Sequence, residues 1–365
     1  MTNGTSQGLF IVVAIVIFGI FVGLSYTLFS GELSPALNGL FGDATEQAGD
    51  ILGGDSGSEY SGWTDVESTR EKDGFIYAKI RTADANGTDF WVKAKKTEDG
   101  KGLVVVSSSD RDYPTGTYWN TPHFGDLVVV SDLYTFPDLI DGIPIVGFED
   151  KVFNNANFKD NIVFPKGLLT IGNFTFYNSE LKGTFNAPKN LVSIGDYAFH
   201  KAMFTGELKL PTSIRTLGNH IFSVSDFSGD LVLPEGLETI GEHTFTGVGF
   251  EEGVVIPSTL KNIPDGAFVN TPFKGTIKIA KGVENIGERA FTEAKFTGNL
   301  IIPEGVKTIG SISFVNSKFT GELILPETLI TIGSSAFQGS IFTSVTKLNP
   351  NTSLDGAFKY GTIIK

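Results

Sequence analysis

A repeat of 23 residues fills the C-terminal part of this 365-residue chain and constrains its fold more than any other feature. The repeat is marked by a phenylalanine that returns at positions 153, 176, 199, 222, 245, 268, 291, 314 and 337, and again at 358 after a unit two residues shorter. Repeats of about 20 to 50 residues are typical of solenoids, in which each unit buries its apolar side only against its neighbours. The spacing therefore predicts a stack of about ten units.

Other positions of the repeat are equally regular. A second aromatic column lies five residues after the first, and the residue between them, three after the first, is small or β-branched in every unit. An alternating run ends in a proline, as in Glu322–Leu325 before Pro326, which predicts a short strand. Because adjacent backbones in a stack lie about 4.8 Å apart, each inward position must keep a similar volume from unit to unit. The phenylalanine columns are therefore predicted to form the core.

This unit resembles the BspA-type leucine-rich repeat of bacterial and protozoan surface proteins. The segments LPEGLETIGEHTF (233–245) and LPETLITIGSSAF (325–337) carry the resemblance, which covers about the last 220 residues. The family often has cysteine where this chain has its small residue, and leucine where it has the second phenylalanine. The resemblance implies a leucine-rich repeat solenoid outside the cell that adheres to host or neighbouring-cell proteins.

The chain is predicted to have five segments: a polar tail at 1–7, an apolar helix at 8–29, an acidic segment with a Gly/Ser linker at 30–62, a β-rich capping domain at 63–141 and the solenoid at 142–365. The fold class is mainly β: a leucine-rich repeat solenoid of about ten 23-residue units, a small N-terminal β-domain and one N-terminal transmembrane helix.

The capping domain is predicted from non-repeating strand signals. Phe75–Ile80 alternates, Asn86-Gly87 is a hairpin turn signal, and Phe90–Lys93, Leu103–Val106 and Leu127–Val130 are further strand-like runs. We expect this domain to cover the first unit of the solenoid, because an exposed solenoid end is prone to aggregate.

Residues 8–29 contain no ionisable side chain except Tyr26. A helix of that length, at about 1.5 Å per residue, reaches about 33 Å and can cross a bilayer. A buried core helix and a cleaved signal peptide are the alternatives, and the second lacks a basic region before the run. The sequence therefore predicts attachment to the membrane through residues 8–29.

Composition excludes several classes of function. The chain has no cysteine, so it has neither disulfides nor thiolate metal sites, and an exported protein of this kind fits a bacterial surface. A net charge of −13 argues against a nucleic-acid partner. Gly54–Gly57 resembles the nucleophile motif of trypsin-like proteases, but no histidine or aspartate is placed to complete a triad. We expect no catalytic residue, no cofactor and no metal, and hence no enzyme.

The outward positions of the first strand in each unit are the candidate site. They lie eight and ten residues after the marker phenylalanine and form a face that a protein could bind; β-branched residues also simply suit strands. The candidate residues are Val163, Lys209, Val232, Val255, Lys278, Ile301, Ile324, Glu207, Asp230 and Glu322.

Two polar columns have mainly structural interpretations. His220 and His243 occupy the same repeat position and should stack on adjacent units, but two imidazoles alone make a weak metal site. A second column of short polar residues is predicted to bond to neighbouring backbone. Its members are Thr170, Ser193, Thr216, Thr239, Asn262, Asn285, Thr308 and Thr331.

Two functions remain in competition. The first is a membrane-tethered, adhesin-like cell-surface protein whose solenoid binds protein partners. The second is a pilin-like filament subunit, in which copies of the 8–29 helix form the core and display the solenoids outside. The ligand, the membrane orientation and the oligomeric state stay open, as does whether the helix is an anchor, a filament core or cleaved.

Overall fold

The computed structural model describes residues 64–82, 90–109, 133–156, 158, 161–223 and 225–358. Contacts divide the chain into two units, Met1–Tyr60 and Ser61–Lys365, and every described residue belongs to the second. The predicted segments at 1–7, 8–29 and 30–62 lie outside the described residues. The same holds for the predicted turn at Asn86-Gly87 and the predicted strand at Leu127–Val130.

All the regular structure in the described ranges is β-strand. Four strands come first, namely β1 (Thr64–Lys72), β2 (Phe75–Thr82), β3 (Phe90–Lys96) and β4 (Leu103–Ser109). They form an antiparallel sheet in chain order. The alternation at Phe75–Ile80 is confirmed by β2, and β1 was not predicted from the sequence.

The antiparallel sheet continues directly into the solenoid. β4 pairs in parallel with β7 (Ile143–Phe148), which β6 (Leu139–Ile140) joins from the side, and β7 pairs in parallel with β9 (Thr170–Ile171). The segments expected as a capping domain (63–141) and a solenoid (142–365) thus share one sheet and one hydrophobic core. The edge of the first unit is covered by β4 rather than left open.

We call each 23-residue unit of the solenoid a rung. Each rung contains one short strand at the same repeat position as β9. After β7 and β9 the series continues with β11 (Ser193–Ile194), β13 (Thr216–Leu217), β16 (Thr239–Ile240), β18 (Asn262–Ile263), β20 (Asn285–Ile286), β22 (Thr308–Ile309) and β24 (Thr331–Ile332). Successive members pair in parallel at a register of 23, as in Ser193 with Thr216, and a second sheet begins at β18. In the described ranges this gives a solenoid of about nine turns, where the sequence predicted about ten.

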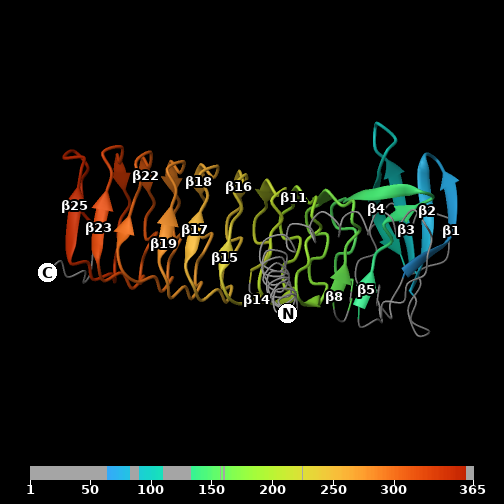
Figure 1. Ribbon diagram of the computed structural model, residues 1–365, viewed down its shortest axis with the longest axis horizontal. Coiled ribbons are helices and arrows are strands. Elements are labelled where there is room, and N and C mark those ends of the chain that lie inside the picture. The colour runs from blue at the N-terminus through green and yellow to red at the C-terminus, as the bar shows by residue number, and fades with distance from the viewer. Residues whose placement is uncertain are drawn as a thin grey trace, which may run out of the picture. The chain divides into compact units, whose positions relative to one another are not determined.

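A second series of strands forms the opposite side of most rungs, and Figure 1 shows its later members side by side. These strands are β5 (Leu133–Thr135), β8 (Asn161–Val163), β15 (Leu231–Val232), β17 (Val254–Ile256), β19 (Ile277–Ile279), β21 (Leu300–Ile301), β23 (Glu322–Leu325) and β25 (Ser344–Lys347). A short sheet beside them contains β10 (Lys182–Gly183), β12 (Met203–Gly206) and β14 (Asp226–Phe227).

The two phenylalanine columns lie in the core, as predicted, together with buried leucine, isoleucine and valine side chains. Phe176 and Phe199 stack with ring centroids 5.4 Å apart and planes 2° apart, and Phe227 stacks on Phe250 in the second column. Rings of different columns meet edge to face, as Phe245 and Phe250 do at 6.0 Å. Between the columns only small side chains fit, and the hydroxyls among them donate to backbone carbonyls, as Ser225 does to Ala202 at 3.1 Å. Volume matching between rungs therefore fixes the repeat.

Candidate functional site

The strands β15, β17, β19, β21 and β23 alternate between the core and the surface. Leu231 and Val254 are buried, whereas their neighbours Val232 and Val255 are 63% and 52% exposed. Ile301 of β21 is 53% exposed in the same way. This period of two leaves one side chain per rung on the outer face of the sheet, ten residues after the marker phenylalanine.

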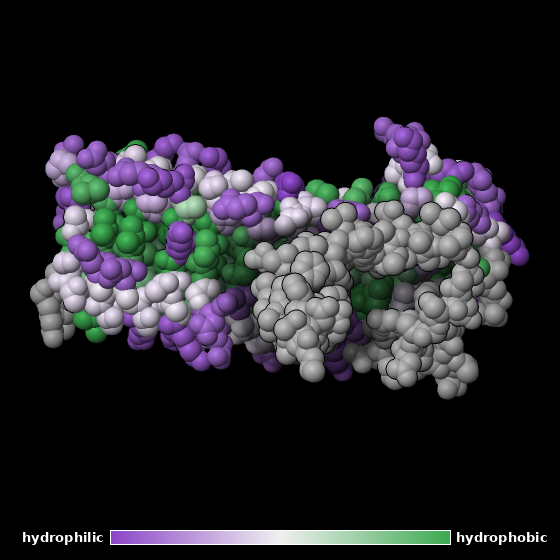
Figure 2. Space-filling model, in the orientation of Figure 1, coloured by the Kyte–Doolittle hydropathy of each residue, from purple (hydrophilic) through white to green (hydrophobic). Residues whose placement is uncertain are grey.

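We call the five outward residues Val232, Val255, Lys278, Ile301 and Ile324 the apolar stripe. Val232 lies beside Val255, and Val255 beside Lys278, in one parallel sheet. Ile301 lies beside Ile324 in the next sheet. Figure 2 shows a hydrophobic band along these rungs, bordered on both sides by hydrophilic residues. Four of the five side chains are aliphatic, and Lys278 lies at the centre, with Val232 and Val255 on one side and Ile301 and Ile324 on the other.

The remaining candidate residues are spread along the solenoid. Val163 is half-buried on β8, in a separate two-stranded sheet. Glu207 and Lys209 are exposed and form an ion pair with each other at 3.2 Å. Asp230 is exposed beside β15, and Glu322 is half-buried, accepting a hydrogen bond from Thr346 Oγ1 at 2.9 Å. The structure thus brings together the five members of the stripe but not all ten candidates.

A shallow pocket opens at the middle of the stripe. It is lined by Lys278 and Lys281 from the β19 rung and by Asn299, Ile301 and Pro303 from the β21 rung. Both lysines are exposed. In the described part of the chain neither of them makes an ion pair or a side-chain hydrogen bond. The pocket therefore combines aliphatic walls with two ammonium groups that have no internal counterion.

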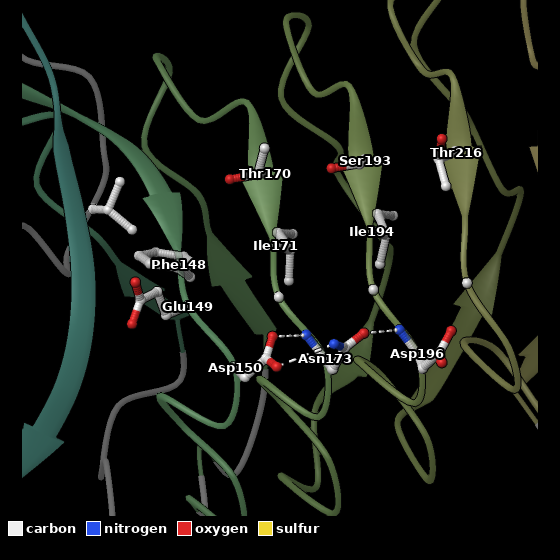
Figure 3. Close-up of a pocket in the computed structure, with 14 residues that line it drawn as sticks. Phe148, Glu149, Asp150, Thr170, Ile171, Asn173, Ser193, Ile194, Asp196 and Thr216 are labelled. Carbon is white, nitrogen blue, oxygen red and sulfur yellow. Dashed lines mark hydrogen bonds between the residues drawn. The ribbon is translucent and has the colours of Figure 1, made fainter. Parts of the chain in front are cut away.

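A second pocket lies on the opposite side of the rungs, along the strands β7, β9, β11 and β13. Asp150, Asn173 and Asp196 line it and follow each other at a spacing of 23 (Figure 3), and Asn219 continues this ladder on the next rung. Each Oδ1 accepts the backbone N–H of the next member at 2.7 Å. The next rung continues the pattern, because the N–H of Glu242 donates to Asn219 Oδ1.

Charge alternates along this carboxylate–amide ladder. Asn173 Nδ2 donates to Asp150 Oδ2 at 3.1 Å, and Asn219 Nδ2 donates to Asp196 Oδ2 at 3.2 Å. An amide between two carboxylates separates like charges that would otherwise lie about one rung apart. The polar atoms of the ladder are thereby used within the protein, which gives them a structural role.

The residues that follow Asn173, Asp196, Asn219 and Glu242 adopt a left-handed backbone. The φ angles are +56° at Phe174, +55° at Tyr197, +52° at His220 and +55° at His243. Such angles are uncommon outside glycine. Here they direct the backbone N–H to a carbonyl of the next rung, as from Phe174 to Asp196 at 2.8 Å. Inter-rung hydrogen bonds thus hold a conformation that the side chains alone disfavour.

The rings of these four residues stack in one column. Centroids are 5.0 Å apart for Phe174 and Tyr197, 4.7 Å for Tyr197 and His220, and 4.8 Å for His220 and His243. The predicted stacking of the two histidines is confirmed. In the described residues no group of three or more His, Cys, Asp or Glu side chains is arranged to hold a metal ion. The four rings of the column pack against one another as an aromatic stack.

The pKa values of His220, which belongs to this column, and of the nearby His200 are lowered, which favours the neutral imidazole. Burial is the largest cause that lowers the pKa of His220, followed by the neighbouring His243 and His200, while Glu242 and Asp196 act against the shift. Burial also lowers the pKa of His200, with Lys201 adding to the effect. His200 stacks on Tyr177 at 5.3 Å. Protonation of either imidazole would place a cation in a half-buried aromatic environment.

The short polar column from Thr170 to Thr331 was predicted to bond to neighbouring backbone. This prediction is wrong for the hydrogen bonds that the structure describes, which join side chain to side chain. Asn285 Nδ2 donates to the side chain of Asn262 at 2.7 Å, and Thr308 Oγ1 donates to Asn285 Oδ1 at 2.7 Å. Thr170 and Thr216 are exposed. The side-chain-to-backbone ladder lies instead three residues further on. The recurring Asp or Asn three residues before the marker phenylalanine is the sequence signal that could have identified it.

No helix with the length and apolarity needed to cross a bilayer occurs in the described ranges. The candidate span at 8–29 lies outside them.

Comparison with known proteins supports the repeat assignment. The sequence profile described as the BspA type leucine rich repeat region matches residues 147–274 and 250–364, in six copies. No curated protein matches the chain.

Several solved structures of leucine-rich repeat proteins match part of the chain. A leucine-rich repeat protein from Bacteroides ovatus is 18% identical, with a TM-score of 0.44, over 70% of this chain and 75% of its own. The T. pallidum leucine-rich repeat protein is 20% identical, with a TM-score of 0.38, over 61% and 85%. The pneumococcal vaccine antigen PcpA is 16% identical, with a TM-score of 0.34, over 79% and 88%.

Proposed function

We propose, for a chain that belongs to the BspA-type leucine-rich repeat family, a role as a cell-surface protein whose apolar stripe binds a partner protein. Repeats of this type occur in surface proteins, and a solenoid offers an extended regular face for binding. Residues 8–29 are proposed to tether the protein to a bacterial membrane, with the solenoid on the outer side. The partner is a protein rather than a nucleic acid, in keeping with the net charge of −13.

The observation that carries this proposal is the exposure of the apolar stripe. Val232 and Val255 on neighbouring rungs, and Ile301 two rungs further on, are each more than half exposed to water. Contiguous aliphatic surface rimmed by polar residues is typical of protein-binding sites. The polar groups on the opposite side bond to one another, which supports a binding role over a catalytic one. We accordingly propose that the protein is not an enzyme.

Surface location is tested first, on intact bacteria that produce the full chain. A non-permeant protease or an antibody against the solenoid should reach the protein without lysis of the cells. A cytoplasmic protein of the same cells serves as the control and should stay intact. Protection of the solenoid until the cells are broken would refute surface display.

Binding is tested with the double variant Val255→Lys/Ile301→Lys, produced as the full chain on the same cells. Adhesion of these cells to protein-coated surfaces or to neighbouring cells should fall at least about tenfold, because two buried aliphatic contacts would be lost. Ile330→Lys is the matched control, since Ile330 is 65% exposed but lies outside the stripe. Equal loss in the control variant, or no loss in the double variant, would argue against the stripe.

Negative-stain electron micrographs distinguish the filament alternative. Single particles on the membrane agree with a tethered binding protein. Regular filaments carrying lobes would mean that residues 8–29 are an assembly element, and the proposed tether would then be replaced by a filament core.

A further inference from the structure

A lysine lies at the centre of the apolar stripe, and aliphatic contacts with a partner do not explain its presence there. Lys278 lies between Val255 and Ile301, and Lys281 lines the same pocket from the following turn. Elsewhere on the solenoid, lysines beside strands form internal ion pairs, as Lys274 does with Glu251 at 3.0 Å and Lys295 with Glu293 at 3.3 Å. Within the described ranges, Lys278 and Lys281 form none.

The acidic residues of this face lie on rungs other than the central one, and Glu251 and Glu252 precede β17 on the rung next to it. Asp230 and Glu235 belong to the β15 rung, and Glu304 and Glu322 border β21 and β23. Glu235 is engaged with Ser258, accepting from its Oγ at 3.0 Å, and Glu304 accepts from the backbone N–H of Glu327. Carboxylates therefore border the central rung on both sides, while Lys278 and Lys281 of the β19 rung keep ammonium groups without an ion pair in the described ranges. A partner that matches this pattern has its negative charge at the centre.

Geometry limits the size of that match. The stripe crosses five rungs, and four intervals of about 4.8 Å give a length of about 19 Å. An extended chain advances about 3.3 Å per residue, so about six residues of a partner strand cover the stripe. The aliphatic residues lie on both sides of Lys278, which places the carboxylate near the middle of such a segment.

We propose that the stripe binds a partner-protein segment in which an aspartate or glutamate is flanked by aliphatic side chains, with the carboxylate in the pocket of Lys278 and Lys281. This rests on the proposed function and specifies its partner. The aliphatic contacts provide most of the binding free energy, because burying apolar surface contributes more to affinity than a half-exposed ion pair does. The ion pair provides selectivity for the acidic segment, since such pairs add modestly to affinity but penalise a wrong charge.

The test is a selection of seven-residue peptides, displayed on phage, on the full chain held in lipid nanodiscs. On the wild-type protein, the selected peptides should be enriched in aspartate or glutamate between aliphatic residues. On Lys278→Glu, the same position should be enriched in lysine or arginine. Selected peptides without an acidic preference on the wild-type protein would overturn the proposal.

Synthetic peptides from that selection then locate the contact by fluorescence anisotropy. Lys278→Gln should weaken the acidic peptide about fivefold and leave its glutamine counterpart unchanged. Lys318→Gln removes one exposed charge outside the stripe and should change neither affinity. Equal effects of Lys278→Gln on both peptides would exclude the ion pair.

Failure of this inference is distinguishable from failure of the proposed function. Peptides that lack an acidic residue but lose binding in Val255→Lys/Ile301→Lys would keep the stripe as the binding face and reject only its partner chemistry. Peptides that bind the double variant as tightly as the wild type would reject both. Self-association of the full chain that Val255→Lys abolishes would identify a second copy as the occupant and overturn the acidic segment.

Discussion

The two sides of each rung use the same repeat in opposite ways. On the side of β9, β11 and β13, the Asp150–Asn219 ladder bonds each rung to the next through carboxylate and amide groups. On the side of β15 to β23, the apolar stripe repeats an aliphatic residue that points into water. A polar group that recurs every 23 residues can satisfy its copy on the next rung, whereas an outward aliphatic group cannot bury itself against its copy. Internal pairing therefore marks the structural side, and unburied aliphatic surface marks the side available to a partner.

Deleting part of a rung breaks both sides at once and should have the largest effect. Removal of residues 304–314, 11 in number, places polar positions of one rung against the phenylalanine columns of the next, so cooperative unfolding of the C-terminal rungs should disappear. Removal of residues 304–326 deletes one period of 23 and joins Pro303 to Glu327, which repeats the natural Pro326–Glu327 junction. That variant should unfold cooperatively in urea. A cooperative transition in the 11-residue deletion would refute the period.

Phe245→Ala removes a core ring that supports both sides. Phe245 is fully buried and stacks on Phe222 and Phe268. The cavity should lower the free energy of unfolding by about 3–5 kcal/mol. Val255→Ala in the stripe is the control and should change it by less than about 1 kcal/mol, because the side chain is already half in water. Equal losses in the two variants, measured by urea denaturation, would contradict the assignment of core and surface.

Asn173→Asp affects the ladder side alone. The new carboxylate still accepts from the Asp196 N–H but loses the bond from Nδ2 to Asp150 and places three acidic residues in a row. We expect the free energy of unfolding to fall by about 1 kcal/mol at about pH 7. The loss should shrink at about pH 3, where a protonated carboxyl donates again. Asn351→Asp, at an exposed turn, makes the same charge change and should have no measurable effect.

Acidification should produce the smallest effect, also on the ladder side. The folded pKa values of His220 and His200 are lowered, so the unfolded chain binds protons more readily than the folded one. Their contribution to stability is present above the ordinary histidine pKa of about 6.5 and is lost as the pH falls below it. His220→Phe should flatten the loss of melting temperature between about pH 7.5 and 5.5. Carboxylates with lowered pKa values, such as Glu293, act at lower pH.

If His220→Phe loses as much melting temperature as the wild type between about pH 7.5 and 5.5, His220 does not cause the loss. The ring at this position is replaceable because Phe174 and Tyr197 occupy it on neighbouring rungs with the same left-handed backbone.

Sequence reasoning reached the core and the outward face because volume and alternation are local properties of the repeat. The phenylalanine columns had to stack, and Val255 had to point away from Val254 and Ile256. It missed the ladder at Asp150 and Asn173 because that position varies among Asp, Asn, Glu and Ser, and because bonding across rungs depends on a left-handed turn that no single residue type specifies. The pocket at Lys278 could not be predicted from the sequence, because it is formed by side chains of two rungs whose relative placement only the structure shows.

The asparagines of the carboxylate–amide ladder make it sensitive to slow chemical degradation. Asparagine is among the residues that degrade on prolonged heating. Hydrolysis of the Asn173 or Asn219 amide yields a carboxylate, which no longer donates to Asp150 or Asp196. The new carboxylate also places negative charges on adjacent rungs, where the amide had separated them. Hydrolysis at Asn173 and Asn219 would therefore remove hydrogen bonds between rungs, while the phenylalanine core of the same rungs would stay unchanged.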